Sequence, residues 1–127
     1  METAVKLQRI SRILVVVAAV TILVLSLLPK EAISHVSLSD KFLHFAAYAT
    51  LSFLAYFSFI KSIDMKLTVI IIIVCFIYGA TIELLQPLVG RNRENMDLLV
   101  NAAGVLVGTT FCILLDLFLR KIKRSIF

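Results

Sequence analysis

The chain has 127 residues, of which 61% are hydrophobic and only 17% are charged. Soluble domains are about 45–50% apolar and about 25% charged, so this chain lacks the polar residues that would cover a soluble surface. The net charge of +5 comes from lysines and arginines, most of them in the short flanks of apolar runs. This pattern fits a membrane topology and argues against nucleic-acid binding.

Four apolar runs fill most of the chain, at about residues 10–28, 42–60, 67–86 and 97–119. Each has close to the roughly 20 residues that a helix needs to cross a bilayer. A membrane β-strand would alternate apolar and polar residues, whereas residues 69–75 are continuously apolar. The sequence therefore predicts an all-α fold, an integral membrane four-helix bundle, with residues 1–127 as a single domain.

The first run follows three basic residues, Lys6, Arg9 and Arg12, which is also how a signal peptide begins. The match to a cleavage site at Ala32-Ile33-Ser34 is weak, and the apolar run is longer than the usual signal core. We therefore expect a retained membrane anchor.

Basic residues are distributed unequally between the two sides that four crossings define. Because basic loops are retained in the cytoplasm, we expect both termini to be cytoplasmic and the loops 29–41 and 87–97 to face outward. The cytoplasmic set is Lys6, Arg9, Arg12, Lys61, Lys66, Arg120, Lys121, Lys123 and Arg124, and the outer set is Lys30, Lys41, Arg91 and Arg93.

Polar residues recur on one face of each of the last three runs, near the expected outer surface. These residues are Lys41, His44 and Tyr48 on the second run, Glu83 and Gln86 on the third, and Asp97 and Asn101 on the fourth. Within each run they are three or four residues apart, which places them on one helix face. A polar group facing lipid costs a few kcal/mol, so we expect these faces to meet in a polar pocket.

Gly104 and Gly108 form a G-x-x-x-G motif in the fourth run. Glycines at this spacing allow two helices to approach closely in a membrane. We favour packing against the neighbouring helices of the same chain, and an oligomer interface is the alternative.

The polar residues suggest two kinds of role. His44 and Glu83 can act as a base and its orienting partner, with Asp97 as a further catalytic candidate. Lys41 and Arg91 can hold a phosphate, diphosphate or carboxylate. The predicted binding set is Asp40, Lys41, His44, Glu83, Gln86, Arg91, Asp97 and Asn101. The alternative is structural, since the same charges can pair with one another and lock the helices together.

No cofactor is predicted. A metal site built from His44, Glu83 and Asp97 is disfavoured, because only one histidine lies in the apolar runs and no compact ligand spacing is visible. The known signatures of intramembrane catalysis are also absent from the sequence. Whether the chain is an enzyme therefore stays open at this point.

The stretch DKFLHFAAYATL, followed by E-x-x-Q, an outer-loop arginine and D-x-x-x-N-x-x-G-x-x-x-G, resembles the VanZ-like family of small bacterial membrane proteins. The resemblance runs from Asp40 to Gly108. One departure is Glu94, where many relatives have aspartate. The matched positions are Asp40, Lys41, His44, Phe45, Tyr48, Glu83, Gln86, Arg91, Asp97, Asn101 and Gly104.

The resemblance implies a bacterial plasma-membrane protein linked to the cell envelope and to susceptibility to the glycopeptide teicoplanin. It implies no settled reaction. The favoured hypothesis is binding of an envelope-precursor lipid, a glycolipid headgroup or a glycopeptide-related ligand among the membrane lipids, and whether the bound group is also modified stays open. The alternatives are a non-catalytic accessory scaffold and a small transporter acting as an oligomer, which the lack of an inverted repeat disfavours.

Overall fold

The computed structural model describes residues 2–33, 39–60 and 64–126, and in these residues all regular structure is helical. Ser34 and Lys61, which entered the predictions above, lie outside the described residues. The elements are α1 (Glu2–Leu27), α2 (Lys30–Ile33), α3 (Asp40–Ser58), α4 (Met65–Leu85), the 3-10 helix η1 (Gln86–Val89) and α5 (Asn95–Ile126). The all-α class is confirmed. The predicted four-helix bundle is not confirmed in that form, because the described residues contain five α-helices.

The helix ends follow local capping chemistry. The side chain of Ser39 accepts a hydrogen bond from the Phe42 amide at 3.1 Å and starts α3, and Asp64 does the same for α4 through the Leu67 amide at 2.7 Å. Gly90 ends η1 with φ of 77°, a left-handed conformation that glycine adopts without strain. Polar side chains therefore fix the starts of α3 and α4.

Two helices extend beyond their predicted bounds. α1 begins at Glu2 rather than at residue 10, and α5 continues to Ile126 rather than ending at residue 119. Ion pairs one turn apart support these extensions, between Lys6 and Glu2 at 3.0 Å and between Arg120 and Asp116 at 2.8 Å. Hydropathy marks the part of a helix that suits lipid, whereas the helix itself continues into its polar flanks.

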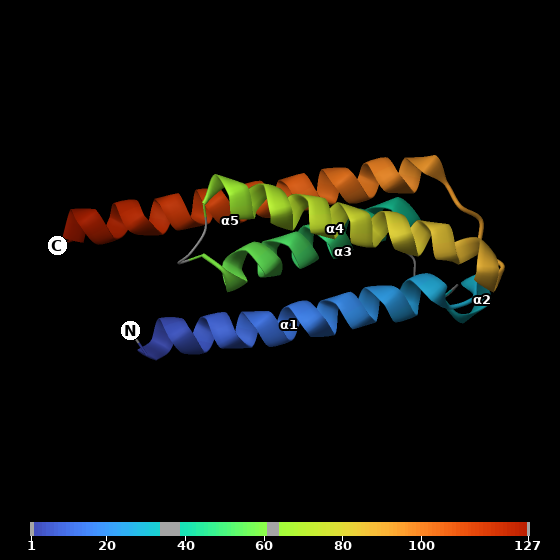
Figure 1. Cartoon of the computed structure of the whole chain (residues 1–127), viewed down its shortest axis with the longest axis horizontal. Coiled ribbons are helices and arrows are strands. Elements are labelled where there is room, and N and C mark those ends of the chain that lie inside the picture. Colours follow the sequence, from blue (N-terminus) through green and yellow to red (C-terminus); the bar gives the residue numbers. More distant parts are fainter. Residues whose placement is uncertain (1, 34–38, 61–63, 127) are drawn as a thin grey trace.

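Three helical segments of the described chain are long and apolar enough to cross a membrane: Glu2–Leu27, Met65–Val89 and Asn95–Ser125. α3 is not among them, because polar residues interrupt its apolar sequence. Several of these polar side chains are buried, and α3 packs against α1, α4 and α5 (Figure 1). The neighbouring helices thus cover the polar face of α3. Its buried polar and tyrosine residues are His44, Tyr48, Ser52, Tyr56 and Ser58.

α3 and α5 approach each other closely at the two glycines of the G-x-x-x-G motif. A Cβ atom on Gly104 would lie 2.5 Å from the carbonyl oxygen of Phe45, and one on Gly108 would lie 2.0 Å from that of Ala49. These are backbone atoms of α3, so no side-chain rotation could relieve the clash. The absence of a side chain at both positions sets the distance between the two helices.

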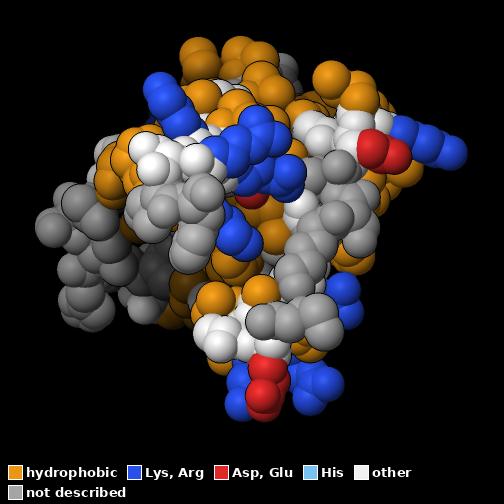
Figure 2. All heavy atoms as spheres, turned by 90° about the vertical axis from the view of Figure 1, so that its left-hand side faces the viewer, with side chains coloured by type: hydrophobic (Ala, Val, Ile, Leu, Met, Phe, Trp, Pro, Cys, Tyr) orange, Lys and Arg blue, Asp and Glu red, His pale blue; other side chains and the backbone are white. Residues whose placement is uncertain are grey.

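The two ends of the molecule differ in character. Both chain termini lie at one end, and Lys and Arg side chains gather on that face (Figures 1 and 2). The opposite end, here called the loop end, contains α2, η1 and the first turns of α3 and α5. The polar residues predicted to form a pocket lie at the loop end.

Candidate functional site

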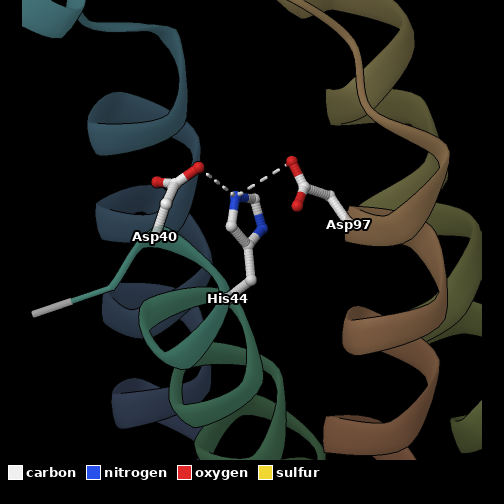
Figure 3. A group of neighbouring side chains, drawn as sticks. All are labelled: Asp40, His44 and Asp97. Atoms are coloured by element: carbon white, nitrogen blue, oxygen red, sulfur yellow. Dashed lines mark ion pairs between the residues drawn. The ribbon is translucent and has the colours of Figure 1, made fainter.

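His44 lies at the centre of the polar cluster, on the first turns of α3, and is only 8% exposed. Its Nδ1 lies 3.1 Å from Oδ1 of Asn101. An amide oxygen can only accept, so Nδ1 donates and the neutral ring presents a lone pair at Nε2. Nε2 faces Oδ2 of Asp40 at 3.8 Å and Oδ2 of Asp97 at 3.9 Å (Figure 3). The imidazole therefore has an amide on one side and two carboxylates on the other.

Glu83 is a buried carboxylate without a hydrogen bond. The residue is 1% exposed, and among the described residues neither of its oxygens has a hydrogen-bond partner. Its closest charged neighbour is Nδ1 of His44, 3.6 Å from Oε1. If the polar residues only lock the helices together, every buried charge should be paired or hydrogen-bonded. Glu83 does not meet that condition. Its position behind the imidazole points to a role in orienting His44.

Lys41 is occupied by two carboxylates, one from the loop before α5 and one from α5 itself. Its Nζ lies 2.7 Å from Oε2 of Glu94 and 3.1 Å from Oδ1 of Asp97. The Asp97 side chain is 4% exposed, and its second oxygen faces His44. Asp97 thus connects the lysine to the imidazole, and Lys41 is not free to clamp an anionic ligand by itself.

Arg91 closes the end of α1. Its Nη1 donates to the carbonyl oxygens of Leu25 at 3.2 Å and Ser26 at 2.9 Å, and Gln86 Nε2 donates to Ser26 at 3.3 Å. The last carbonyls of a helix have no partner within it, and the last turn of α1 contains no basic residue. Arg91 and Gln86, predicted as ligand contacts, supply these missing donors. Arg91 also places Nη2 3.7 Å from Asp40.

A cleft of about 770 Å³ lies between α1 and α3, and its polar end is formed by Lys30, Asp40, His44 and Arg91. The sequence interpretation missed the contribution of α1, because this helix has no charged residue at that depth. On α1 the only sequence feature that indicates the cleft is Ala18, whose small side chain leaves room in the cleft wall. Apolar lining residues include Ala18, Ile22, Leu25, Leu43 and Ala47.

A comparison with protein-family models decides the relationship of this chain to known proteins. The model described as VanZ/LLP1 matches residues 3–117. The chain belongs to the VanZ/LLP1 family. The predicted resemblance is therefore confirmed, and the match covers α1 and most of α5 as well as the polar motifs. Searches of curated proteins and of solved structures returned no significant match.

In this VanZ/LLP1 protein the predicted residues fall into two groups. One group consists of His44, the four side chains within 4 Å of its ring, and Lys41, which contacts Asp97. The other group closes the end of α1. The first comprises Asp40, Lys41, His44, Glu83, Asp97 and Asn101, and the second comprises Gln86 and Arg91. Sequence spacing alone could not separate the two groups, because the acceptors for the second lie on α1.

The exposed contact between Lys41 and Glu94 gives a prediction for pH dependence. The hydrogen bond from Lys41 holds the pKa of the Glu94 carboxyl below its ordinary value of 4.5. A lowered folded-state pKa stabilises the fold above the ordinary value, and this stabilisation is lost as the pH falls through the lowered pKa. We expect Glu94→Gln to lower the midpoint of thermal unfolding slightly at about pH 7, and the difference from wild type to be smaller at an acidic pH below the ordinary carboxyl value.

Circular dichroism at both pH values measures this difference. Arg93→Gln, an exposed change one residue earlier, is the control and should follow wild type throughout. A gap between wild type and Glu94→Gln that widens on acidification would contradict the assignment.

Proposed function

We propose that this VanZ/LLP1 protein is a multi-pass protein of the bacterial plasma membrane, with both termini in the cytoplasm and the loop end outside. Four long helices, α1, α3, α4 and α5, would cross the bilayer, with α3 shielded from lipid by the other three. The basic residues on the face with both termini support this orientation. The three helices that are long and apolar enough to span support the location in a membrane.

A cysteine placed at Asn92, in the outer turn between η1 and α5, tests the orientation. The native cysteines, Cys75 and Cys112, are buried, so labelling of intact cells with a membrane-impermeant maleimide reports the new residue. We expect Asn92→Cys to react in intact cells and Arg124→Cys to react only after lysis. The reverse pattern would overturn the orientation.

The function we propose is binding of an envelope lipid or glycolipid by its headgroup at the loop end. The cleft between α1 and α3 carries this proposal, because its polar end and apolar walls match the two parts of a lipid. Sites for small ligands are usually concave and apolar, with a few polar groups that fix orientation. Asp40, His44 and Arg91 supply such groups beside the expected level of the headgroups. Altered susceptibility to teicoplanin-type glycopeptides is the expected cellular readout.

A scaffold role is the second candidate, and specific contacts favour it. Lys41 is paired with Glu94 and Asp97, and Arg91 donates to two backbone carbonyls of α1. These residues hold helices together whether or not a ligand is present. A scaffold role does not explain the open cleft. It also does not explain why the buried Glu83 carboxylate has no hydrogen-bond partner among the described residues.

A cleft-filling variant separates the two candidates. Ala18→Phe places a ring in the apolar wall, whereas Val17→Phe adds a ring on the exposed face of the same helix. We expect lipid extracted from the purified protein, identified by mass spectrometry, to lose one specific class in Ala18→Phe and to keep it in Val17→Phe. If wild type carries only bulk phospholipid, or if both variants carry the same lipids as wild type, the headgroup proposal fails and the scaffold reading stands.

A further inference from the structure

We propose that Asp40, His44 and Asp97 bind a divalent metal ion at the polar end of the cleft. One oxygen or nitrogen from each side chain can be chosen so that the three atoms lie within 4.8 Å of one another. Ligand atoms about 2.1 Å from a common ion lie roughly 3–4 Å apart. The distances of 3.8 Å and 3.9 Å from His44 Nε2 to the two carboxylates already fall in that range (Figure 3). Small side-chain rotations would complete the coordination.

The side of the imidazole that faces away from the proposed ion has contacts typical of a metal-binding histidine. Asn101 accepts a hydrogen bond from Nδ1 of His44, which directs the Nε2 lone pair toward the two aspartates. Glu83 lies behind the same Nδ1 at 3.6 Å, buried and without a hydrogen-bond partner among the described residues. Metal-binding histidines usually give their second nitrogen to a carboxylate or carbonyl, which fixes the ring and raises its basicity. In this arrangement the buried Glu83 carboxylate helps to orient the imidazole from the side away from the ion.

The charge of the cluster also favours a cation. Four carboxylates and two basic side chains take part in the contact network, and His44 is neutral when it acts as a ligand. With the carboxylates ionised, the network has two negative charges in excess, and Lys30 at the same end of the cleft reduces this excess to one. The carboxylates are those of Asp40, Glu83, Glu94 and Asp97, and the basic side chains are those of Lys41 and Arg91.

The ligand types indicate which ions fit. One imidazole with two carboxylates suits Zn²⁺, Mn²⁺ or Fe²⁺, whereas Mg²⁺ and Ca²⁺ prefer oxygen ligands alone. Three protein ligands leave coordination positions open, and Asp40 and His44 both line the cleft. An ion there would hold a phosphate or hydroxyl group. Lys41 and Arg91, which the sequence suggested for that role, are engaged in other contacts. Holding such a group depends on the proposed function, whereas metal binding itself does not.

This inference departs from the expectation of no metal site. In the sequence, His44, Glu83 and Asp97 show no compact ligand spacing. In the fold, Asp40 joins His44 from one turn earlier on α3, Asp97 approaches from the start of α5, and Glu83 moves to the far side of the ring. The ligand set is therefore formed by helix packing rather than by a local motif.

Metal binding is tested on the full chain, purified in detergent and stripped with a chelator. We expect isothermal titration with ZnCl₂ or MnCl₂ alone to show one ion per chain, and binding to be lost in His44→Ala and Asp40→Asn. Glu83→Gln should weaken it by roughly 10–100-fold, as loss of an outer-shell partner does. Asp116→Asn, which removes an acid from the opposite part of α5, is the matched control and should bind like wild type.

The Asp40 side chain is about half exposed, so Asp40→Asn is expected to fold and keeps the test valid if His44→Ala does not. No saturable binding by wild type, or equal affinity in wild type and Asp40→Asn, would overturn the metal site. Ala18→Phe should keep the metal while losing the lipid. If metal binding fails but Ala18→Phe still removes a specific lipid, the metal inference falls and the proposed function stands.

Discussion

Alanine at Gly108 is expected to lower the free energy of unfolding by about 3 kcal/mol or more, the upper part of the range for overpacked interiors. The added methyl group would lie 2.0 Å from the Ala49 carbonyl oxygen and 2.3 Å from Ser52 Oγ. α5 could accommodate it only by moving away from α3. Because Asp97 and Asn101 are on α5 and His44 is on α3, such a shift would also open the polar cluster.

Heating the purified protein and measuring the monodisperse fraction by size-exclusion chromatography reports this loss. Ala103→Val is the matched control, since it adds methyl groups to the exposed face of the same helix, and it should change stability little. An unchanged midpoint in Gly108→Ala would show that α3 and α5 tolerate a wider separation than the structure has.

Arg91→Ala is expected to destabilise the protein by about 3 kcal/mol, because two charge-assisted hydrogen bonds to backbone carbonyls contribute about 1.5–3 kcal/mol each. The substitution leaves the Leu25 carbonyl without this donor and the Ser26 carbonyl with Gln86 alone, and it removes the cation beside Asp40. Arg91→Lys should recover only part of the loss, since one ammonium group cannot contact both α1 and Asp40 with a planar fork.

Arg93→Ala provides the comparison, because this neighbouring arginine is exposed and should change stability by less than about 0.5 kcal/mol. The readout is the same thermal assay. If Arg91→Ala stays as stable as Arg93→Ala and yet loses a bound lipid, the guanidinium serves the ligand rather than α1. That result would return Arg91 to the binding role that the sequence suggested.

Much of the fold was accessible from hydropathy and spacing. The apolar runs located the long helices, and the polar faces predicted that His44, Glu83, Asp97 and Asn101 point to a common level. Hydropathy could not show that α3 is shielded, since its sequence alone is less apolar than that of its neighbours. It also missed the short helix α2 and the extensions of α1 and α5, which depend on local hydrogen bonds and ion pairs.

The site was accessible only where its residues share a helix face. Lys41 and His44 are three residues apart, so spacing places them together. The partners of Arg91 lie on α1, 65 and 66 residues away in the chain, and no local pattern records such a pairing. The same limit applies to Asp40 and Asp97, whose proximity depends on how α5 packs against α3.

The pairing of Arg91 with α1 also has a consequence for biosynthesis. Leu25 and Ser26 leave the ribosome long before Arg91 is made, so the last carbonyls of α1 lack the Arg91 donor while α3 and α4 are being synthesised. During that interval water must solvate them. The polar end of the cleft is thus completed late, when the turn after η1 emerges and joins the first helix to the last.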